Sequence, residues 1–397
     1  MKNHLAIIAT HPIQYHAPWF RALAEHPEIE LEVLYCHRAT PQEQASAGFN
    51  VEFEWDVSLL DGYRHRFLLN VARQPSLHGF AGLDTPEIAA IVKEENFDAV
   101  IVNGWNYKSA WQTMRACWRA KTPVMMRSDS HLFTTRNFAK RLLKWPVYNW
   151  FIPKLDACLP AGTWSRDYFL QYGAHPEKLF TVPHAIDGGY FESESARWAP
   201  RRNELREAWG LCRNRTVFLF VGKFTEKKRP MDFLRAVDHA AKGGANLCGL
   251  MVGDGRLRSE CETFVSAHDA PIRFAGFLNQ SEITKAYVAA DALVLPSDGG
   301  ETWGLVVNEA MSCGRPCFVS SRVGCGPDLI VPGETGNIFQ VGDIDALALL
   351  LSSCARQQGR LLEMGVRARR QMTAHSIEAA VESTRQALTA VTRKRKT

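Results

Sequence analysis

The stretch from Asp291 to Gly314, DALVLPSDGGETWGLVVNEAMSCG, contains a strand, a loop and a helix in that order. ALVLPS is a short apolar run typical of a buried strand, DGGETWG has the composition of a loop, and LVVNEAMSCG has helical spacing and ends at a glycine. The backbone N–H groups of Gly304, Leu305 and Val306 then lie at a helix N-terminus, where an anion such as phosphate is stabilised. The stretch therefore predicts an anion site at the carboxyl end of a strand.

Two glutamates flank this predicted anion site. Glu301 lies in the loop and Glu309 lies within the helix, so each can contact a different part of one ligand. Carboxylates suit sugar hydroxyls because they accept strong hydrogen bonds. The residues alone leave an alternative open, in which both glutamates are ordinary solvated carboxylates at a helix start.

A second group of charges lies upstream in VGKFTEKKRP, residues 221–230. There a strand, a glycine and a turn bring Lys223 and Lys228 near the same edge of the sheet. Two ammonium groups beside a helix N-terminus can hold a diphosphate of about two negative charges without a metal. The predicted ligand is therefore a sugar joined through a diphosphate to a nucleoside.

Strand and helix patterns alternate along most of the chain. Apolar runs such as HLAIIAT, LEVLYC and DAVIVNG alternate with helical patterns, and the alternation starts again at TVFLFVGK. This is typical of doubly wound α/β sheets, and 397 residues exceed one ordinary domain. We predict an N-terminal Rossmann-like domain over 1–185, a linker over 186–200 and a C-terminal Rossmann-like domain over 201–374, which carries the predicted site for the sugar–diphosphate–nucleoside. Residues 375–397 are expected to form a helix that packs back toward the N-terminal domain and ends in a basic tail.

The composition narrows the class of protein. A hydrophobic fraction of 46% and a charged fraction of 22% are those of a soluble globular protein, and no run reaches the about 18 apolar residues of a membrane-spanning helix. The ten cysteines contain no C-x-x-C pair, which gives no support to a zinc or redox site and suits a reducing cytoplasm. A net charge of +5, without a recognised nucleic-acid-binding fold, gives little support to nucleic-acid binding.

The ordered motifs resemble those of the family 4 glycosyltransferases, whose GT-B fold has two Rossmann-like domains facing a central cleft. VGKFTEKKRP resembles the family's V-G-R-x-x-x-x-K segment, LMVGDGRLR its G-x-G turn, and ETWGLVVNE its pair of glutamates separated by seven residues. Residues 272–297 are similar to its base-binding region, and VPHAID at 182–187 to its linker motif. The resemblance covers most of the chain and is strongest from Val217 to about Val341.

This resemblance implies roles for individual residues. Glu301 would contact hydroxyls of the donor sugar, Glu309 those of the ribose, and Lys223 with Lys228 the diphosphate. Lys223 stands where the family usually has arginine, so it lacks the bidentate fork of that side chain. Catalysis is assigned to Glu301, His131 and Lys228. The predicted donor site comprises Gly222, Lys223, Lys228, Gly253, Gly276, Phe277, Leu278, Glu301, Gly304, Leu305, Val306 and Glu309.

The first strand is followed by THPIQYHAPWF, where the family commonly has a Gly-Gly loop. His11, Gln14, Tyr15 and His16 are therefore polar candidates for contact with the acceptor or a phosphate. The alternative is that the prolines shape a turn whose polar residues are structural.

The segment RSDSHL places Asp129 and His131 at the carboxyl end of another strand. Asp129 is a further candidate on the acceptor side. The family has a histidine at a similar position near the reacting face of the sugar, which suggests the same place for His131. A single histidine is also often a satisfied structural residue.

The function that the resemblance implies is a retaining hexosyltransferase. It would move a sugar from a nucleotide donor, UDP- or GDP-linked, to a glycan or lipid-linked acceptor in bacterial surface polysaccharide assembly. No Asp-x-Asp metal motif is evident in the loop directly after any of the predicted strands, so metal independence is predicted and no other cofactor is expected. A sugar-nucleotide epimerase, a phosphorylase and a non-catalytic sugar-nucleotide binder stay open as alternatives.

Residues 136–154 mix basic and aromatic side chains, and two interpretations stay open. The segment could rest on an anionic membrane surface, which would make the protein peripheral on the inner face of the cytoplasmic membrane. It could equally be an ordinary helix with a buried aromatic side and a solvated basic side. Pro146 predicts a break in any single long helix there.

Overall fold

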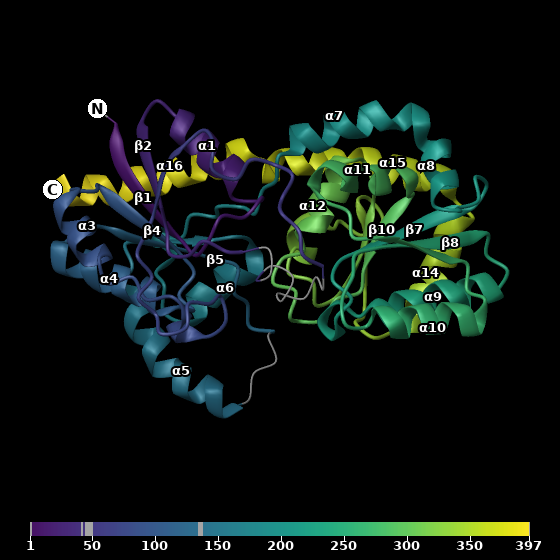
Figure 1. Cartoon of the computed structure of the whole chain (residues 1–397), viewed down its shortest axis with the longest axis horizontal. Coiled ribbons are helices and arrows are strands. Elements are labelled where there is room, and N and C mark those ends of the chain that lie inside the picture. Colours follow the sequence, from purple (N-terminus) through teal and green to yellow (C-terminus); the bar gives the residue numbers. More distant parts are fainter. Residues whose placement is uncertain (1, 41–42, 44–50, 134–137, 397) are drawn as a thin grey trace.

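The computed structural model describes residues 2–40, 43, 51–133 and 138–396. In these residues the chain forms two six-stranded sheets in which neighbouring strands run parallel. Figure 1 shows the two halves of the chain side by side, with helices around each sheet. The predicted pair of doubly wound α/β domains is confirmed.

The N-terminal sheet has the strand order β3-β2-β1-β4-β5-β6. The order reverses at β1, which pairs with both β2 and β4. In doubly wound sheets, ligands bind at such a reversal, outside the carboxyl ends of the strands. The strands are β1 Asn3–Ala9, β2 Ile29–Tyr35, β3 Arg64–Phe67, β4 Ala99–Asn103, β5 Val124–Ser128 and β6 Ala157–Pro160.

The helices of this half alternate with its strands along the chain. A proline near the start of α1, where the backbone N–H has no partner within the helix, favours a helix beginning there. Buried side chains on α1 and α4 pack on the sheet from their apolar faces. The α-helices are α1 Ala17–Glu25, α3 Ile88–Glu94, α4 Lys108–Ala120, α5 Phe138–Phe151 and α6 Thr163–Gln171, with short 3-10 turns at Phe80–Gly82, Ile152–Lys154 and Pro176–Lys178.

Helix α5 contradicts the predicted break at Pro146, because it continues through that residue. A proline removes one backbone hydrogen bond, and here tertiary packing offsets that loss. Tyr148 and Phe151 follow the proline in the helix and are buried within the N-terminal domain. There both rings contact Trp105. Arg136, on which the membrane interpretation also drew, lies outside the described residues.

The C-terminal sheet has the strand order β12-β11-β10-β7-β8-β9. Its central strands β7 and β10 are fully buried, as the continuous apolar runs of their sequences indicate. Apolar side chains cover both of its faces, with Leu219 and Leu295 in one cluster and Phe218 and Phe318 in the other. The strands are β7 Thr216–Val221, β8 Leu247–Val252, β9 Ile272–Gly276, β10 Ala292–Leu295, β11 Cys317–Ser320 and β12 Gly336–Phe339.

Two helices connect the halves of the chain. Within the segment 186–200, α7 packs on α11 and α12 of the C-terminal domain. The last helix, α16, leaves the C-terminal domain and packs on α1, as its yellow ribbon shows in Figure 1. The helices of the second half are α7 Gly188–Trp198, α8 Arg202–Ala208, α9 Pro230–Lys242, α10 Arg258–His268, α11 Gln280–Ala289, α12 Leu305–Ser312, α13 Gly326–Leu329, α14 Ile344–Ala355, α15 Gln358–Gln371 and α16 Ile377–Lys396, with 3-10 turns at Ala199–Arg201, Glu226–Lys228 and Met372–His375.

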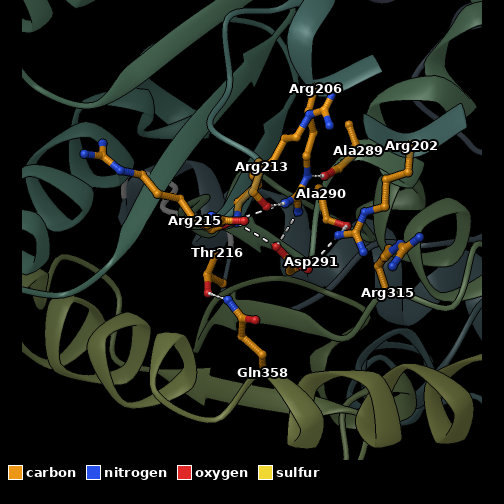
Figure 2. A network of polar contacts seen from close by, with 12 residues as sticks. Arg202, Arg206, Arg213, Arg215, Thr216, Ala289, Ala290, Asp291, Arg315 and Gln358 are labelled. Atoms are coloured by element: carbon orange, nitrogen blue, oxygen red, sulfur yellow. Dashed lines mark hydrogen bonds and ion pairs between the residues drawn. The ribbon is translucent and has the colours of Figure 1, made fainter. Parts of the chain in front are cut away.

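Asp291, just before β10, ties α8 to the C-terminal sheet (Figure 2). Its carboxylate accepts hydrogen bonds from Arg202 at 2.6 Å, from Arg206 at 2.7 Å and from the backbone N–H of Val217 at 2.8 Å. Arg206 also donates to the carbonyl oxygens of Ala289 and Arg213, at 2.8 and 2.9 Å. The network fixes the amino ends of β7 and β10, whose carboxyl ends carry the candidate site.

None of the helices in the described part of the chain is long and apolar enough to cross a membrane. All ten cysteines are free thiols. Cys313 and Cys317 are buried, where a free cysteine packs as a small apolar residue.

Candidate active site

The loop after β10 and the start of α12 form the centre of the candidate site. Gly304, the residue before α12, has φ +103°, a left-handed conformation that favours glycine. A Cβ on Gly304 would lie 2.9 Å from a methyl carbon of Leu295, so the turn into the helix requires glycine on steric grounds as well. The predicted helix start is confirmed, and the first backbone N–H groups of α12 open toward the domain interface.

Two adjoining cavities lie where the domains meet, and both domains line each of them. The larger encloses about 440 Å³ and the smaller about 190 Å³. They share Tyr15, Lys228 and Val306. The larger cavity is otherwise lined by Thr10, Ile13, His16, Asn103, Gly104, Trp105, Asn106, Arg127, Ser128, Asp129, Ser130, His184, Glu301, Thr302, Trp303, Gly304 and Leu305, and the smaller by Gln14, Trp55, Val221, Gly222, Lys223, Val252, Gly253, Phe277, Leu278, Asn279, Gln280, Ile283 and Glu309.

Glu309 accepts hydrogen bonds from two tyrosines. The hydroxyl of Tyr15, from the N-terminal domain, donates to Oε1 at 2.8 Å, and the hydroxyl of Tyr287 on α11 donates to Oε2 at 2.6 Å. Burial raises the pKa of Glu309 to about 7, although both hydrogen bonds favour the ionised form. Glu309 therefore sits at the wall of the smaller cavity with one contact from each domain.

The lysines and Glu301 form a charged group between the cavities. Lys228 donates a hydrogen bond to Glu301, and Ser297 donates to the same carboxylate oxygen at 3.3 Å. Burial, with the charges of Lys227 and Lys228, lowers the pKa of Lys223 to about 8. A dianion placed beside these lysines would relieve their mutual repulsion.

Close backbone approach brings the lysine-bearing turn to the cavity. Gly253 has φ +126°, and a Cβ there would lie 2.1 Å from the carbonyl oxygen of Gly222. The N–H of Gly253 donates to the carbonyl of Gly276 at 2.8 Å, which joins the carboxyl ends of β8 and β9. Phe277 and Leu278 then follow on the wall of the smaller cavity, whereas the described cavity linings do not include Gly276.

Asp129 links the two domains at the larger cavity. Thr302 donates to its Oδ2 at 2.7 Å, and Nε2 of His184 lies 3.6 Å from the same atom. Arg127, which can only donate, lies 3.2 Å from Nδ1 of His184, so the proton of that neutral ring belongs on Nε2, facing Asp129. Burial opposes ionisation of Asp129, but its bonds with His184 and Thr302 and the charge of Arg127 hold its pKa well below the ordinary value.

The other N-terminal candidates are divided by the structure. His16 and Tyr15 line the larger cavity, and Tyr15 and Gln14 line the smaller one. The cavity linings, as far as the described residues go, include neither His11 nor His131. Burial lowers the pKa of His11 to about 4, and His131 is buried, where its Nδ1 accepts the N–H of Phe133 at 3.1 Å.

Several residues that line the cavities escaped the sequence analysis. Asn103 is the last residue of β4, and Arg127 is the last but one of β5. Their places at strand ends were a usable signal. His184 lies in VPHAID, which was interpreted only as a linker motif. Trp55 had no usable signal, because it lies far from any strand end along the sequence. The described residues contain no group of three or more His, Cys, Asp or Glu arranged to hold a metal ion.

Comparison with family models gives two matches that together span most of the chain. Residues 15–185 match the glycosyl transferase 4-like domain, and residues 201–371 match glycosyl transferases group 1. This chain belongs to the family 4 glycosyltransferases. The resemblance of the motifs is thereby confirmed.

Relatives and solved structures extend this result. The D-inositol 3-phosphate glycosyltransferase of Mycobacterium tuberculosis (strain H37Rv) is 30% identical over 208 residues, which are 50% of this chain and 41% of that relative. The Anabaena protein Alr3699/HepE, solved in complex with UDP, has a TM-score of 0.73 at 17% identity and covers 98% of this chain and 100% of its own. WaaG, a glycosyltransferase involved in lipopolysaccharide biosynthesis, has a TM-score of 0.65 at 15% identity, with 96% and 98% covered. The GT-B fold is confirmed.

Proposed function

We propose that this family 4 member is a retaining glycosyltransferase that uses a nucleoside diphosphate sugar, UDP- or GDP-linked. The observation that carries the proposal is the pair of adjoining cavities between the domains, joined at Lys228 and Tyr15. The smaller cavity combines Lys223 with Glu309 and an apolar wall, which suits a nucleoside diphosphate. The larger cavity holds Glu301 and Asp129 and has room for a sugar and an acceptor. UDP bound to the Anabaena structure of the same fold supports the class of donor.

In this proposal the diphosphate lies between the lysines and the start of α12. Lys228 now donates to Glu301, and a bound diphosphate would compete with that carboxylate for the ammonium group. Glu301 would then turn to a hydroxyl of the donor sugar, which can donate to it. The ribose hydroxyls would bind Glu309, whose oxygens have lone pairs beyond those used by Tyr15 and Tyr287.

The proposed reaction takes place on one face of the sugar. The bond between the anomeric carbon and the diphosphate oxygen breaks, the acceptor oxygen bonds to the same face, and the acceptor's proton passes to the departing diphosphate. Negative charge grows on the diphosphate in the transition state, so Lys223, Lys228 and the N–H groups of α12 stabilise it more than the ground state. No metal is needed for this stabilisation because the cations are supplied by the chain. Asp129, ionised at the cavity wall, would accept a hydrogen bond from a hydroxyl of the sugar or of the acceptor.

The proposed acceptor is a glycan or a lipid-linked glycan of surface polysaccharide assembly, a role that WaaG's involvement in lipopolysaccharide biosynthesis supports by analogy of fold. A membrane-bound acceptor would suit α5, where Trp145, Val147 and Trp150 are exposed. The ammonium group of Lys154 lies 3.8 Å from the ring centre of Trp150. Exposed aromatic rings beside lysines favour the interface of an anionic membrane. We therefore propose that the protein is cytoplasmic and peripheral on the inner face of the cytoplasmic membrane.

The experiment that tests the donor proposal is a thermal-shift panel of UDP-, GDP-, ADP- and dTDP-sugars. A ligand that binds only the folded protein raises its melting temperature, and one nucleotide series is expected to do so. Glu309→Ala should reduce that shift, measured from its own ligand-free midpoint, whereas the exposed Glu334→Ala should keep it. If no compound in the panel shifts wild type and titration calorimetry also detects no binding, the proposal is wrong.

Transfer itself is tested with the donor that the panel identifies. Labelled sugar should appear on an extracted glycan or lipid-linked acceptor, with the anomeric configuration of the donor kept and with activity unchanged by a chelator. An epimerase would instead release an altered sugar without acceptor, and a phosphorylase would require added phosphate. Inverted configuration or loss of activity with chelator would contradict the retaining or the metal-independent part of the proposal.

A further inference from the structure

Residues 51–56, which we call the interdomain strap, lie between β2 and β3 of the N-terminal domain but contact the C-terminal domain. Asn279 donates a side-chain hydrogen bond to the carbonyl oxygen of Glu54 at 2.7 Å. The N–H of Ser281 lies 3.2 and 3.3 Å from the two carboxylate oxygens of Asp56, and its hydroxyl donates to one of them. The strap therefore joins elements that are 225 residues apart in the sequence.

The carboxylate of Asp56 sits at the first turn of α11, which begins at Gln280. N–H groups in the first turn of a helix lack partners within the helix, and the helix dipole favours a negative charge there. Asp56 thus supplies to α11 a cap that comes from the other domain. This contact holds the strap against the helix whose N-terminal end borders the smaller cavity.

The strap places two aromatic rings on its inner side. Phe53 and Trp55 are partly buried, whereas Glu52, Glu54 and Asp56 between and after them are exposed, which is the alternation of an extended segment. Phe53 packs on Phe277 with ring centres 4.4 Å apart, and on Trp55 with ring centres 4.9 Å apart at an angle of 90°. Trp55 in turn lines the smaller cavity.

The residues that line both cavities indicate where a bound diphosphate would lie. Lys228 and Val306 border both cavities, so the diphosphate end of the smaller one faces the larger. Trp55, Leu278 and Ile283 border the smaller cavity and supply part of its apolar lining. A nucleoside diphosphate whose phosphates lie at the lysines would leave its base to contact this apolar lining.

We propose that Trp55, from the N-terminal domain, forms a wall of the nucleobase site and stacks on the base of the donor. This inference rests on the proposed donor, a nucleoside diphosphate sugar. Flat aromatic rings bind bases through their faces, and aliphatic side chains such as Leu278 and Ile283 provide no comparable surface. The ring of Phe277 also borders the cavity, where it packs on Phe53. The base would then be bound by both domains, and the cap that Asp56 makes on α11 would preorganise Trp55 for it.

Titration calorimetry with UDP, GDP and inorganic diphosphate tests this assignment. One of the two nucleotides is expected to bind wild type. Trp55→Ala should raise the Kd of that nucleotide about tenfold to a hundredfold, the range that loss of a stacked ring gives. It should leave the Kd of inorganic diphosphate unchanged, because that probe has no base. Trp55→Phe should recover most of the affinity, and Trp150→Ala, which removes an exposed tryptophan on α5, should have no effect.

Hydrogen–deuterium exchange on wild type gives a second readout that does not depend on a variant folding. The bound nucleotide should slow exchange in peptides that contain the interdomain strap, and inorganic diphosphate should not. Equal affinity of wild type and Trp55→Ala for the nucleotide would overturn the assignment and leave the proposed donor intact. Equal weakening of nucleotide and inorganic diphosphate would also overturn it, because the effect would then lie outside the base. If neither nucleotide binds wild type, the proposed donor fails first and the assignment fails with it.

Discussion

Substituting Glu309 by glutamine should make the protein more stable than wild type at pH 8, and the advantage should shrink toward pH 5. Burial raises the pKa of this carboxyl from 4.5 to about 7. Below pH 4.5 the group is protonated in both the folded and the unfolded chain, so wild type has its full stability there. As the pH rises through 7, the unfolded chain loses this proton more readily than the folded one, and stability falls.

The size of the effect follows from the two pKa values. A difference of about 2.5 pKa units corresponds to about 3 kcal/mol at most, and about 2–3 kcal/mol of that develops between pH 5 and pH 8. The side chain is 2% exposed, so solvent screening reduces the figure little. Glutamine cannot ionise, and its amide can still accept from one tyrosine and donate to the other.

Urea unfolding of both proteins, followed by circular dichroism at pH 5, 6, 7 and 8, measures the difference in free energy of unfolding. Glu363→Gln, whose side chain is 70% exposed on α15, is a matched control for the loss of a carboxyl group. The difference between Glu309→Gln and wild type should grow with pH in favour of the variant, whatever its absolute value. A difference that is the same at pH 5 and pH 8 would refute the argument that burial raises the pKa of Glu309.

Three further substitutions test other parts of the structure. Gly253→Ala should destabilise the protein by at least about 1–3 kcal/mol, because its φ of +126° is strained for alanine and a Cβ would also clash with the carbonyl of Gly222; a melting temperature equal to that of wild type would contradict this. Asp291→Asn should cost about 3–5 kcal/mol in urea unfolding because it leaves the buried guanidinium of Arg206 without its carboxylate, and a loss below about 1 kcal/mol would show that the pair is not coupled. Lys228→Met should weaken nucleoside diphosphate binding about tenfold or more in calorimetry and reduce its dependence on salt, and an unchanged Kd would place the diphosphate elsewhere.

Much of the fold was predictable because it depends on local patterns. Buried parallel strands are continuous apolar runs, and Pro18, at the second position of helix α1, favours a helix that begins there. Strands β3, β6 and β12 were not predicted, because each is an edge strand of only four residues, too short to give a clear pattern. Helix α7 was missed because the 186–200 segment is rich in polar and turn residues, and only its packing on α11 and α12 makes it helical.

Part of the candidate site was also predictable from local patterns. The start of α12 at Gly304 and the order of Lys223, Lys228, Glu301 and Glu309 along the strand ends could be predicted from sequence, because a strand end and the helix after it are neighbours in the chain.

The sequence by itself determined the two doubly wound domains and the charged groups at the edge of the second sheet, because both follow from residues close together in the chain. Only the tertiary structure decided that Tyr15 meets Glu309, that Asp129 meets Thr302, and that the interdomain strap reaches α11. These contacts join residues 173 to 294 positions apart, and no local pattern specifies them. They form because two separately folded sheets bury their carboxyl edges against each other, which brings polar groups from distant segments into reach of one ligand.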